Sequence, residues 1–99
     1  MFDLNTINAR YFDVTIGKLV LQVEPPKIKV LKKIMALTKS RNEDALIELS
    51  EAVRLILNKN KTKCVVSCDV IDELDTDQLN EVIAAYFEWL GKVKNSPNS

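Results

Sequence analysis

Histidine is absent from this chain of 99 residues, and glycine occurs only as Gly17 and Gly91. Without histidine, the chain lacks the commonest general acid–base group and the commonest metal ligand of proteins. Two isolated glycines cannot form a glycine-rich phosphate loop, and the sequence contains no Walker pattern and no Gly-x-Ser-x-Gly turn. The sequence therefore predicts a protein that is not an enzyme, with no catalytic and no cofactor-binding residue.

Cysteine is also scarce, since Cys64 and Cys68 are the only two. Their spacing allows either a metal or redox pair or two small apolar residues of the interior. Two thiolates without histidine cannot complete a tetrahedral zinc site. The closely spaced acids of residues 72–77 do not form the glycine-centred loop that binds calcium. We therefore expect two buried cysteines and no metal site.

Long apolar runs are absent as well, because a membrane-spanning helix needs about 20 apolar residues and the runs here are a few residues long. The first six residues show no basic region followed by an apolar stretch, so we expect no signal peptide. Hydrophobic residues make up 46% of the chain and charged residues 28%, which is typical of a globular protein. We expect one domain over residues 1–93, a disordered tail over residues 94–99, and a cytoplasmic location without membrane contact.

The clearest pattern that the sequence does contain is that of a β-hairpin over residues 11–24. Apolar residues alternate with other residues on both sides of a central Gly-Lys pair: Phe12, Val14, Ile16, Leu19, Leu21 and Val23. A two-residue turn at Gly17-Lys18 places Ile16 opposite Leu19, and glycine in its first position favours a type II′ turn. All six apolar side chains then share one face, which must pack on helices because a lone hairpin is not stable.

Two helices are predicted after Pro25-Pro26 ends the second strand. The first covers residues 26–39, and its apolar residues recur at helical spacing: Ile28, Leu31, Ile34, Met35 and Leu37. The second covers residues 41–58, and a capping box of Ser40 and Glu43 precedes it. Its predicted buried stripe consists of Leu46, Leu49, Val53, Ile56 and Leu57.

A short helix over residues 68–74, capped by Ser67, is predicted next, either separate from the last helix or merged with it. The last helix covers residues 76–93 and follows a capping box of Asp75 and Gln78. Its apolar stripe consists of Leu79, Val82, Ile83, Tyr86, Leu90 and Val93. We therefore predict a mainly α (α+β) fold in which the hairpin packs on three or four helices.

The last helix carries more apolar side chains than one buried stripe needs, because Phe87 and Trp89 widen it. The excess can form core beneath the hairpin, which is the interpretation that we favour. It can instead form an exposed anchor, since tyrosine and tryptophan are enriched in binding hot spots. In that case a partner's helix binds in an apolar groove, and the candidate wall residues are Tyr86, Trp89 and Leu90.

The net charge is zero, because 14 basic residues balance 14 acidic ones. The basic and acidic residues are nevertheless segregated along the chain. Residues 27–41 hold bases and no acid: Lys27, Lys29, Lys32, Lys33, Lys39 and Arg41. Residues 69–88 hold acids and no base: Asp69, Asp72, Glu73, Asp75, Asp77, Glu81 and Glu88. This asymmetry tells more about partners than the total charge does.

Three interpretations of the basic segment remain open. It can be a solvated helix face whose lysine stems cover the edge of the core. It can be a docking face for an acidic protein surface, including the acidic helices of another copy, which favours head-to-tail contacts. It can also bind nucleic acid, although the chain is neutral and shows no arginine-rich pattern. The candidate contacts between copies are Lys27, Lys29, Lys32, Lys33, Asp72, Asp75 and Asp77.

The order of these features resembles the tail assembly chaperones of siphophages and prophages of Gram-positive bacteria. The likeness covers about residues 11–90. It lies in the hairpin Tyr-Phe-Asp-Val-Thr-Ile-Gly-Lys-Leu-Val-Leu, the Pro-Pro-Lys before a basic helix, the acidic stretch and the closing Leu-Asn-Glu-Val-Ile-Ala-Ala-Tyr-Phe-Glu-Trp-Leu. It is a likeness of order and not of an invariant motif, so no residue is carried over as a known site.

The resemblance implies a protein that binds the tape measure protein during tail assembly, keeps it soluble and helps to recruit tail tube subunits. It also implies self-association, a place in the cytoplasm of the bacterial host and absence from the mature virion. The alternative is a small nucleic-acid-binding regulator that uses the basic helix from Lys27 to Arg41.

Overall fold

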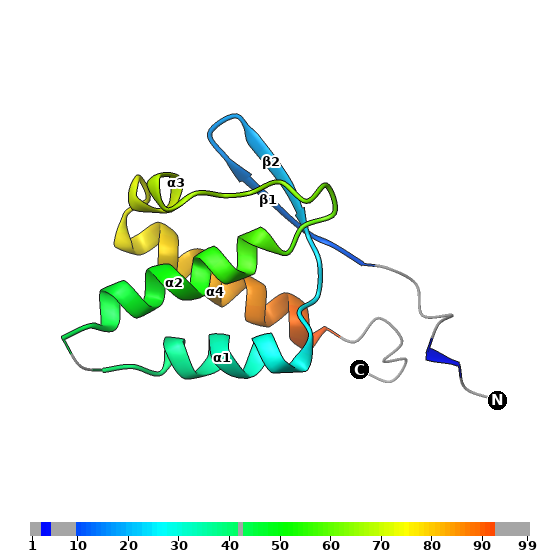
Figure 1. Cartoon of the computed structure of the whole chain (residues 1–99), viewed down its shortest axis with the longest axis horizontal. Coiled ribbons are helices and arrows are strands. Elements are labelled where there is room, and N and C mark those ends of the chain that lie inside the picture. Colours follow the sequence, from blue (N-terminus) through cyan, green and yellow to red (C-terminus); the bar gives the residue numbers. More distant parts are fainter. Residues whose placement is uncertain (1–2, 5–9, 42, 93–99) are drawn as a thin grey trace.

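The computed structural model describes residues 3–4, 10–41 and 43–92, so the tail predicted over residues 94–99 lies outside the described residues. Its elements are β1 (Phe12–Ile16), β2 (Leu19–Val23), α1 (Ile28–Thr38), α2 (Ala45–Asn58), α3 (Cys68–Asp72) and α4 (Thr76–Gly91). An antiparallel hairpin thus precedes four helices in the described part of the chain (Figure 1). This order confirms the predicted α+β fold class.

The hairpin has the register that its alternating pattern predicts. The strands pair from Phe12 opposite Val23 down to the two residues that flank the turn. Gly17 has a φ of +59° and the residue after it has a negative φ, which is the combination that a type II′ turn requires. Leu21 faces the core and is 1% exposed, whereas Val20 on the opposite face is 68% exposed.

Helices α1 and α2 run antiparallel and pack against each other (Figure 1). α1 begins two residues later than predicted, because Lys27 is extended and stands as its N-cap. Its stripe centres on Ile34, which is 0% exposed. Ile28 and Met35 were predicted in this stripe but are 66% and 40% exposed, because a step of 100° per residue puts both at the edge of the buried arc.

α2 begins at Ala45, four residues after the predicted start, so the predicted capping box of Ser40 and Glu43 does not begin this helix. Asp44 is the N-cap of α2 instead, and the backbone N–H of Ser40 donates to the carbonyl oxygen of Leu37 just after α1. Leu46 then falls in the first turn of α2 and is 53% exposed, which corrects its predicted burial. The later part of the predicted stripe is confirmed as core: Val53, Ile56 and Leu57.

Both later helices have the caps that the sequence predicts. The Ser67 hydroxyl accepts from the N–H of Val70 at the start of α3. Asp75 and Gln78 form the reciprocal capping box of α4, with bonds of 2.8 and 2.9 Å. α3 is a separate helix that ends two residues before its predicted end, because the N–H groups of residues 73 and 74 bond three residues back and close the turn. The predicted last residue of α4, Val93, lies outside the described residues.

The connection from α2 to α3 is held by many hydrogen bonds. The backbone of residues 59–61 pairs with residues 22–24 through hydrogen bonds of 2.7 and 2.9 Å, next to β2. Asn60 is 1% exposed, and its side-chain amide donates to the carbonyl oxygens of Leu57 and Cys64 at 2.8 Å each. Its side-chain oxygen accepts from the N–H of Cys64 at 2.8 Å. A buried amide therefore replaces the backbone pairing that this turn lacks.

The core lies where the hairpin, α2 and α4 meet, and α1 and α3 close it from two sides. Its buried hydrophobic members are Leu21, Val23, Ile34, Ala52, Val53, Ile56, Leu57, Val66, Ile71, Leu79 and Tyr86. The cysteines do not both belong to it, since Cys64 is half-buried and Cys68 is exposed. The prediction of two buried cysteines is therefore wrong for Cys68, because the first residue of α3 faces solvent.

Candidate protein-binding surfaces

An apolar groove lies between α2 and α3 and continues to the start of α4. It encloses about 430 Å³ between α2 and α3, and an adjoining hollow of about 380 Å³ extends toward α4. Both hollows are lined by Leu46, Ser50, Ile71 and Asp72. We call this feature the α2–α3 groove.

The apolar wall of the α2–α3 groove is exposed. Leu46 and Ile47, which are consecutive in the first turn of α2, are 53% and 70% exposed. The floor is Ile71, the buried residue of α3. Because α3 is only five residues long, it covers too little of α2 to bury this wall. Adjacent exposed apolar side chains beside a hollow are typical of a binding site.

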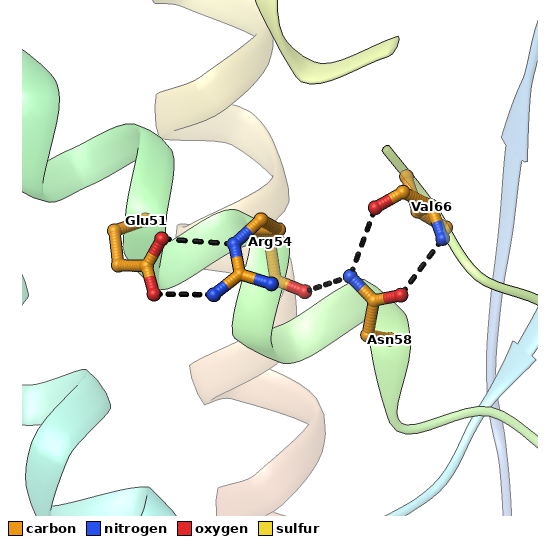
Figure 2. A network of polar contacts seen from close by, with 4 residues as sticks. All are labelled: Glu51, Arg54, Asn58 and Val66. Atoms are coloured by element: carbon orange, nitrogen blue, oxygen red, sulfur yellow. Dashed lines mark hydrogen bonds and ion pairs between the residues drawn. The ribbon is translucent and has the colours of Figure 1, made fainter. Parts of the chain in front are cut away.

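Asn58 of α2 holds the chain that leads into α3, and an ion pair within α2 lies beside it (Figure 2). Nε and Nη2 of Arg54 donate to the two carboxylate oxygens of Glu51 at 2.9 and 2.6 Å, at the edge of the groove. The Asn58 side chain donates to the carbonyl oxygen of Arg54 and exchanges two bonds, of 3.1 and 2.7 Å, with the backbone of Val66. The two bonds with Val66 hold the chain that leads into α3 against α2, on one side of the groove.

The rim of the α2–α3 groove is acidic. The hydrogen bond from Arg54 lowers the pKa of Glu51, and the same bond raises the pKa of Arg54, so the pair is fully charged and self-neutralising near neutral pH. Asp72 and Asp75 also line the two hollows, and neither forms an ion pair with any residue that the structure describes. Asp77 follows in the first turn of α4 and is exposed. The unpaired charge at the groove is therefore negative.

The outer face of α1 carries the opposite charge. Its predicted contact residues are all exposed and form no ion pair within the described part of the chain: Lys27, Lys29, Lys32 and Lys33. Ile28 and Met35 lie two turns apart on the same side of the helix, with half-buried Leu31 between them. We call these three residues the α1 stripe. α1 thus presents an apolar edge with Lys32 beside it on the solvent side.

The structure keeps the predicted basic and acidic contacts apart. α1 packs on one side of α2, and α3 contacts the other side (Figure 1). The lysines of α1 therefore cannot neutralise Asp72 or Asp75 within one molecule. Both surfaces remain available to a partner.

The aromatic residues that were predicted to form a groove wall lie elsewhere. Tyr86 is 1% exposed, and its ring centroid lies 5.9 Å from those of Phe12 and Trp89. Burial raises the pKa of the Tyr86 hydroxyl. Tyr86 is therefore core beneath the hairpin, which was the favoured interpretation, and its candidate role as an exposed wall residue is corrected.

Trp89 is half-buried between Phe12 and Arg10. Its ring stacks on Phe12 with centroids 5.6 Å apart, and the guanidinium carbon of Arg10 lies 4.6 Å from its centroid. Nη1 of Arg10 donates to the carbonyl oxygen of Lys92 at 2.6 Å, and Nη2 donates to those of Trp89 and Leu90 at 3.0 and 3.3 Å. Arg10 thereby satisfies free carbonyls at the end of α4.

The predicted wall residues Trp89 and Leu90 do not line the α2–α3 groove. Both are partly covered and pack against the core. Leu79, which does line the groove, lies about 15 Å from Trp89 along α4 at the 1.5 Å rise per helical residue. The exposed apolar surface therefore lies near the start of α4 and not at its aromatic end.

Sequence reasoning missed both the groove and the role of Arg10. For the groove, a signal was present: Leu46 and Ile47 are adjacent, and two adjacent residues point about 100° apart on a helix, so one of them leaves the buried face. For Arg10, no local signal exists, because its partners lie at least 79 residues further along the chain.

Within residues 3–4, 10–41 and 43–92, no group of histidine, cysteine, aspartate or glutamate residues is arranged to hold a metal ion. In the same part of the chain, no helix has the length and apolar character needed to cross a bilayer. Comparisons of the chain with protein-family models, with curated proteins and with solved structures found no match.

Proposed function

We propose that this protein is a tail assembly chaperone of a siphophage or prophage, which binds the tape measure protein and associates with copies of itself. The α2–α3 groove carries the binding part of the proposal, because it offers exposed apolar side chains beside a hollow that is open to a partner. The resemblance in the order of hairpin, basic helix, acidic stretch and closing helix supports the family.

The groove suits a helical client. A helix that lays apolar side chains into it contacts Leu46, Ile47 and Ile71, in the manner of other helix-in-groove complexes. The acidic rim favours client segments whose apolar residues are flanked by lysine or arginine. Shielding such segments keeps a long helical tape measure protein soluble until tube subunits assemble around it. In this proposal the protein acts in the host cytoplasm, is left out of the mature virion and catalyses no reaction.

The test is binding of amphipathic segments of the tape measure protein. The proposal expects the gene for this partner to be very long and to lie next to the gene for this protein, with the major tail protein gene on the other side. We expect Leu46→Glu and Ile47→Glu to raise the dissociation constant at least tenfold, because each places a carboxylate in an apolar contact. Val20→Glu changes a residue of similar exposure (68%) outside the groove and should leave binding unchanged. Equal binding by all three variants would exclude the groove.

A second candidate function, nucleic-acid binding, is favoured by the unpaired lysines of α1. Two features argue against it: the exposed Ile28 and Met35 interrupt the lysines, and the chain as a whole is neutral. Steeply salt-dependent binding of labelled DNA, lost when Lys32 and Lys33 become glutamate, would support this alternative. The chaperone proposal expects no DNA shift at low salt.

A further inference from the structure

The α1 stripe and the α2–α3 groove match each other in length. From Ile28 to Met35 the stripe is about 10 Å long, at 1.5 Å per residue. Along α2, the groove extends from Leu46 to Arg54, which is about 12 Å. Both surfaces are apolar along their centre, with exposed side chains that the fold of one molecule leaves uncovered.

The two surfaces also match in charge. Lys32 borders the stripe on its solvent side and Lys27 precedes it, whereas Asp72 and Asp75 stand at the groove. None of these groups forms an ion pair within the described residues of one molecule, and the Asp75 carboxylate accepts one hydrogen bond, from the N–H of Gln78. A groove with apolar walls and carboxylates at its rim is complementary to an apolar surface that has ammonium groups at its border.

We propose that the α1 stripe of one copy docks into the α2–α3 groove of the next copy. This inference rests on the proposed self-association and names the two surfaces that produce it. Ile28, Leu31 and Met35 lie against Leu46, Ile47 and Ile71, while the lysines reach the acids of the rim.

The position of the two surfaces decides the kind of assembly. They are different patches on opposite sides of α2, so the contact is head-to-tail and does not close as a symmetric pair. Such contacts produce a ring or a helical array. Each contact also occupies a groove, so a client segment must displace the α1 stripe of the neighbouring copy in order to bind.

A complementation experiment tests the pairing directly. Met35→Glu disables the stripe and Leu46→Glu disables the groove, and glutamate preserves helix propensity at both exposed positions. In multi-angle light scattering over a range of concentrations, each variant alone should stay monomeric, with a dissociation constant at least tenfold above that of the wild type. An equimolar mixture should form a one-to-one dimer and grow no further, since one intact stripe meets one intact groove. Val20→Glu should associate like the wild type.

Cross-linking provides an independent measurement, because Cys68 lines the groove and is exposed. In a Cys64→Ser background, Met35→Cys should form disulfides with Cys68 of neighbouring copies under mild oxidation. A non-reducing gel should then show dimers, trimers and larger species. Ala36→Cys, also exposed but turned 100° around α1, is the matched control and should cross-link at least fivefold less.

The possible failures are distinguishable. If the wild type associates but Met35→Glu and Leu46→Glu associate equally well, the named surfaces are wrong and self-association stands. If the wild type is monomeric at all concentrations, both self-association and this docking mode are overturned, while client binding by the groove remains open to its own test. If Leu46→Glu alone still dimerises, the α1 stripe of one copy contacts the α1 stripe of another copy. The head-to-tail arrangement is then wrong. Circular dichroism must show that every variant keeps the wild-type helix content.

Discussion

At the residue scale, the molecule depends on polar side chains that replace missing backbone hydrogen bonds. Asn60 and Asn58 do this in the connection between α2 and α3, and Arg10 does it at the end of α4. Each of them serves backbone groups that the regular helices and strands leave unpaired. Asn58 and Asn60 therefore hold the chain that leads into α3, although neither lines the groove.

Asn60→Ala should lower the free energy of unfolding by about 2–3 kcal/mol, because it leaves the buried backbone groups of Leu57 and Cys64 without partners. Urea denaturation followed by circular dichroism measures this. Asn80→Ala, at an exposed position of α4, is the control and should cost less than about 0.5 kcal/mol. A loss for Asn60→Ala as small as that of the control would contradict the role given to this side chain.

Arg10→Ala should lower the free energy of unfolding by about 1–2 kcal/mol, because the helix end loses its donors and Trp89 loses the cation above its ring. Arg10→Lys should restore little of it, since an ammonium group cannot match the planar fork that reaches several carbonyls. The emission of Trp89, the only tryptophan, should report both variants during unfolding. Full rescue by lysine would show that charge alone matters.

At the element scale, the hairpin was predictable and the start of α2 was not. The register of β1 and β2 follows from a two-residue alternation and a glycine turn, both of which are local. The burial of Leu46 depends on how far α3 and α4 reach along α2, which periodicity does not contain. The same limit applies to Tyr86. The sequence pattern shows that the apolar face of the last helix is wider than one stripe, but only the contact with Phe12 shows that this tyrosine belongs to the core.

The ion pair on α2 gives the fold a small, signed pH dependence. Because Arg54 lowers the pKa of Glu51 below its ordinary 4.5, the pair stabilises the folded state above that value, and the contribution is lost as pH falls through the folded-state pKa. About a third of each side chain is exposed, so the expected size is about 0.5 kcal/mol.

Glu51→Gln should therefore be about 0.5 kcal/mol less stable than the wild type near pH 7, and the difference should shrink as the pH falls below the ordinary pKa of 4.5. Urea midpoints near neutral pH and at acidic pH provide the measurement. Glu81→Gln, at an exposed position with no ion pair to a described residue, should show no such difference. A gap between Glu51→Gln and the wild type that widens on acidification would reverse the sign and contradict the account.

At the scale of the whole molecule, segregated charge and two uncovered apolar surfaces combine. The sequence alone indicates the charge segregation, because bases and acids occupy separate segments. It does not indicate that α2 separates them in space, or that each has an apolar surface beside it. Both facts come from tertiary packing, and together they make one copy a suitable neighbour for the next.

The central claim is that proteins dock in the α2–α3 groove, and methyl chemical-shift mapping tests it most directly. A labelled monomeric Met35→Glu variant, titrated with an amphipathic segment of the tape measure protein, keeps the groove free of neighbouring copies. The account predicts saturable shifts at Leu46, Ile47 and Ile71, with Val20 unchanged. Shifts confined to the end of α4 around Trp89 and Leu90, with the groove methyls unmoved, would contradict it.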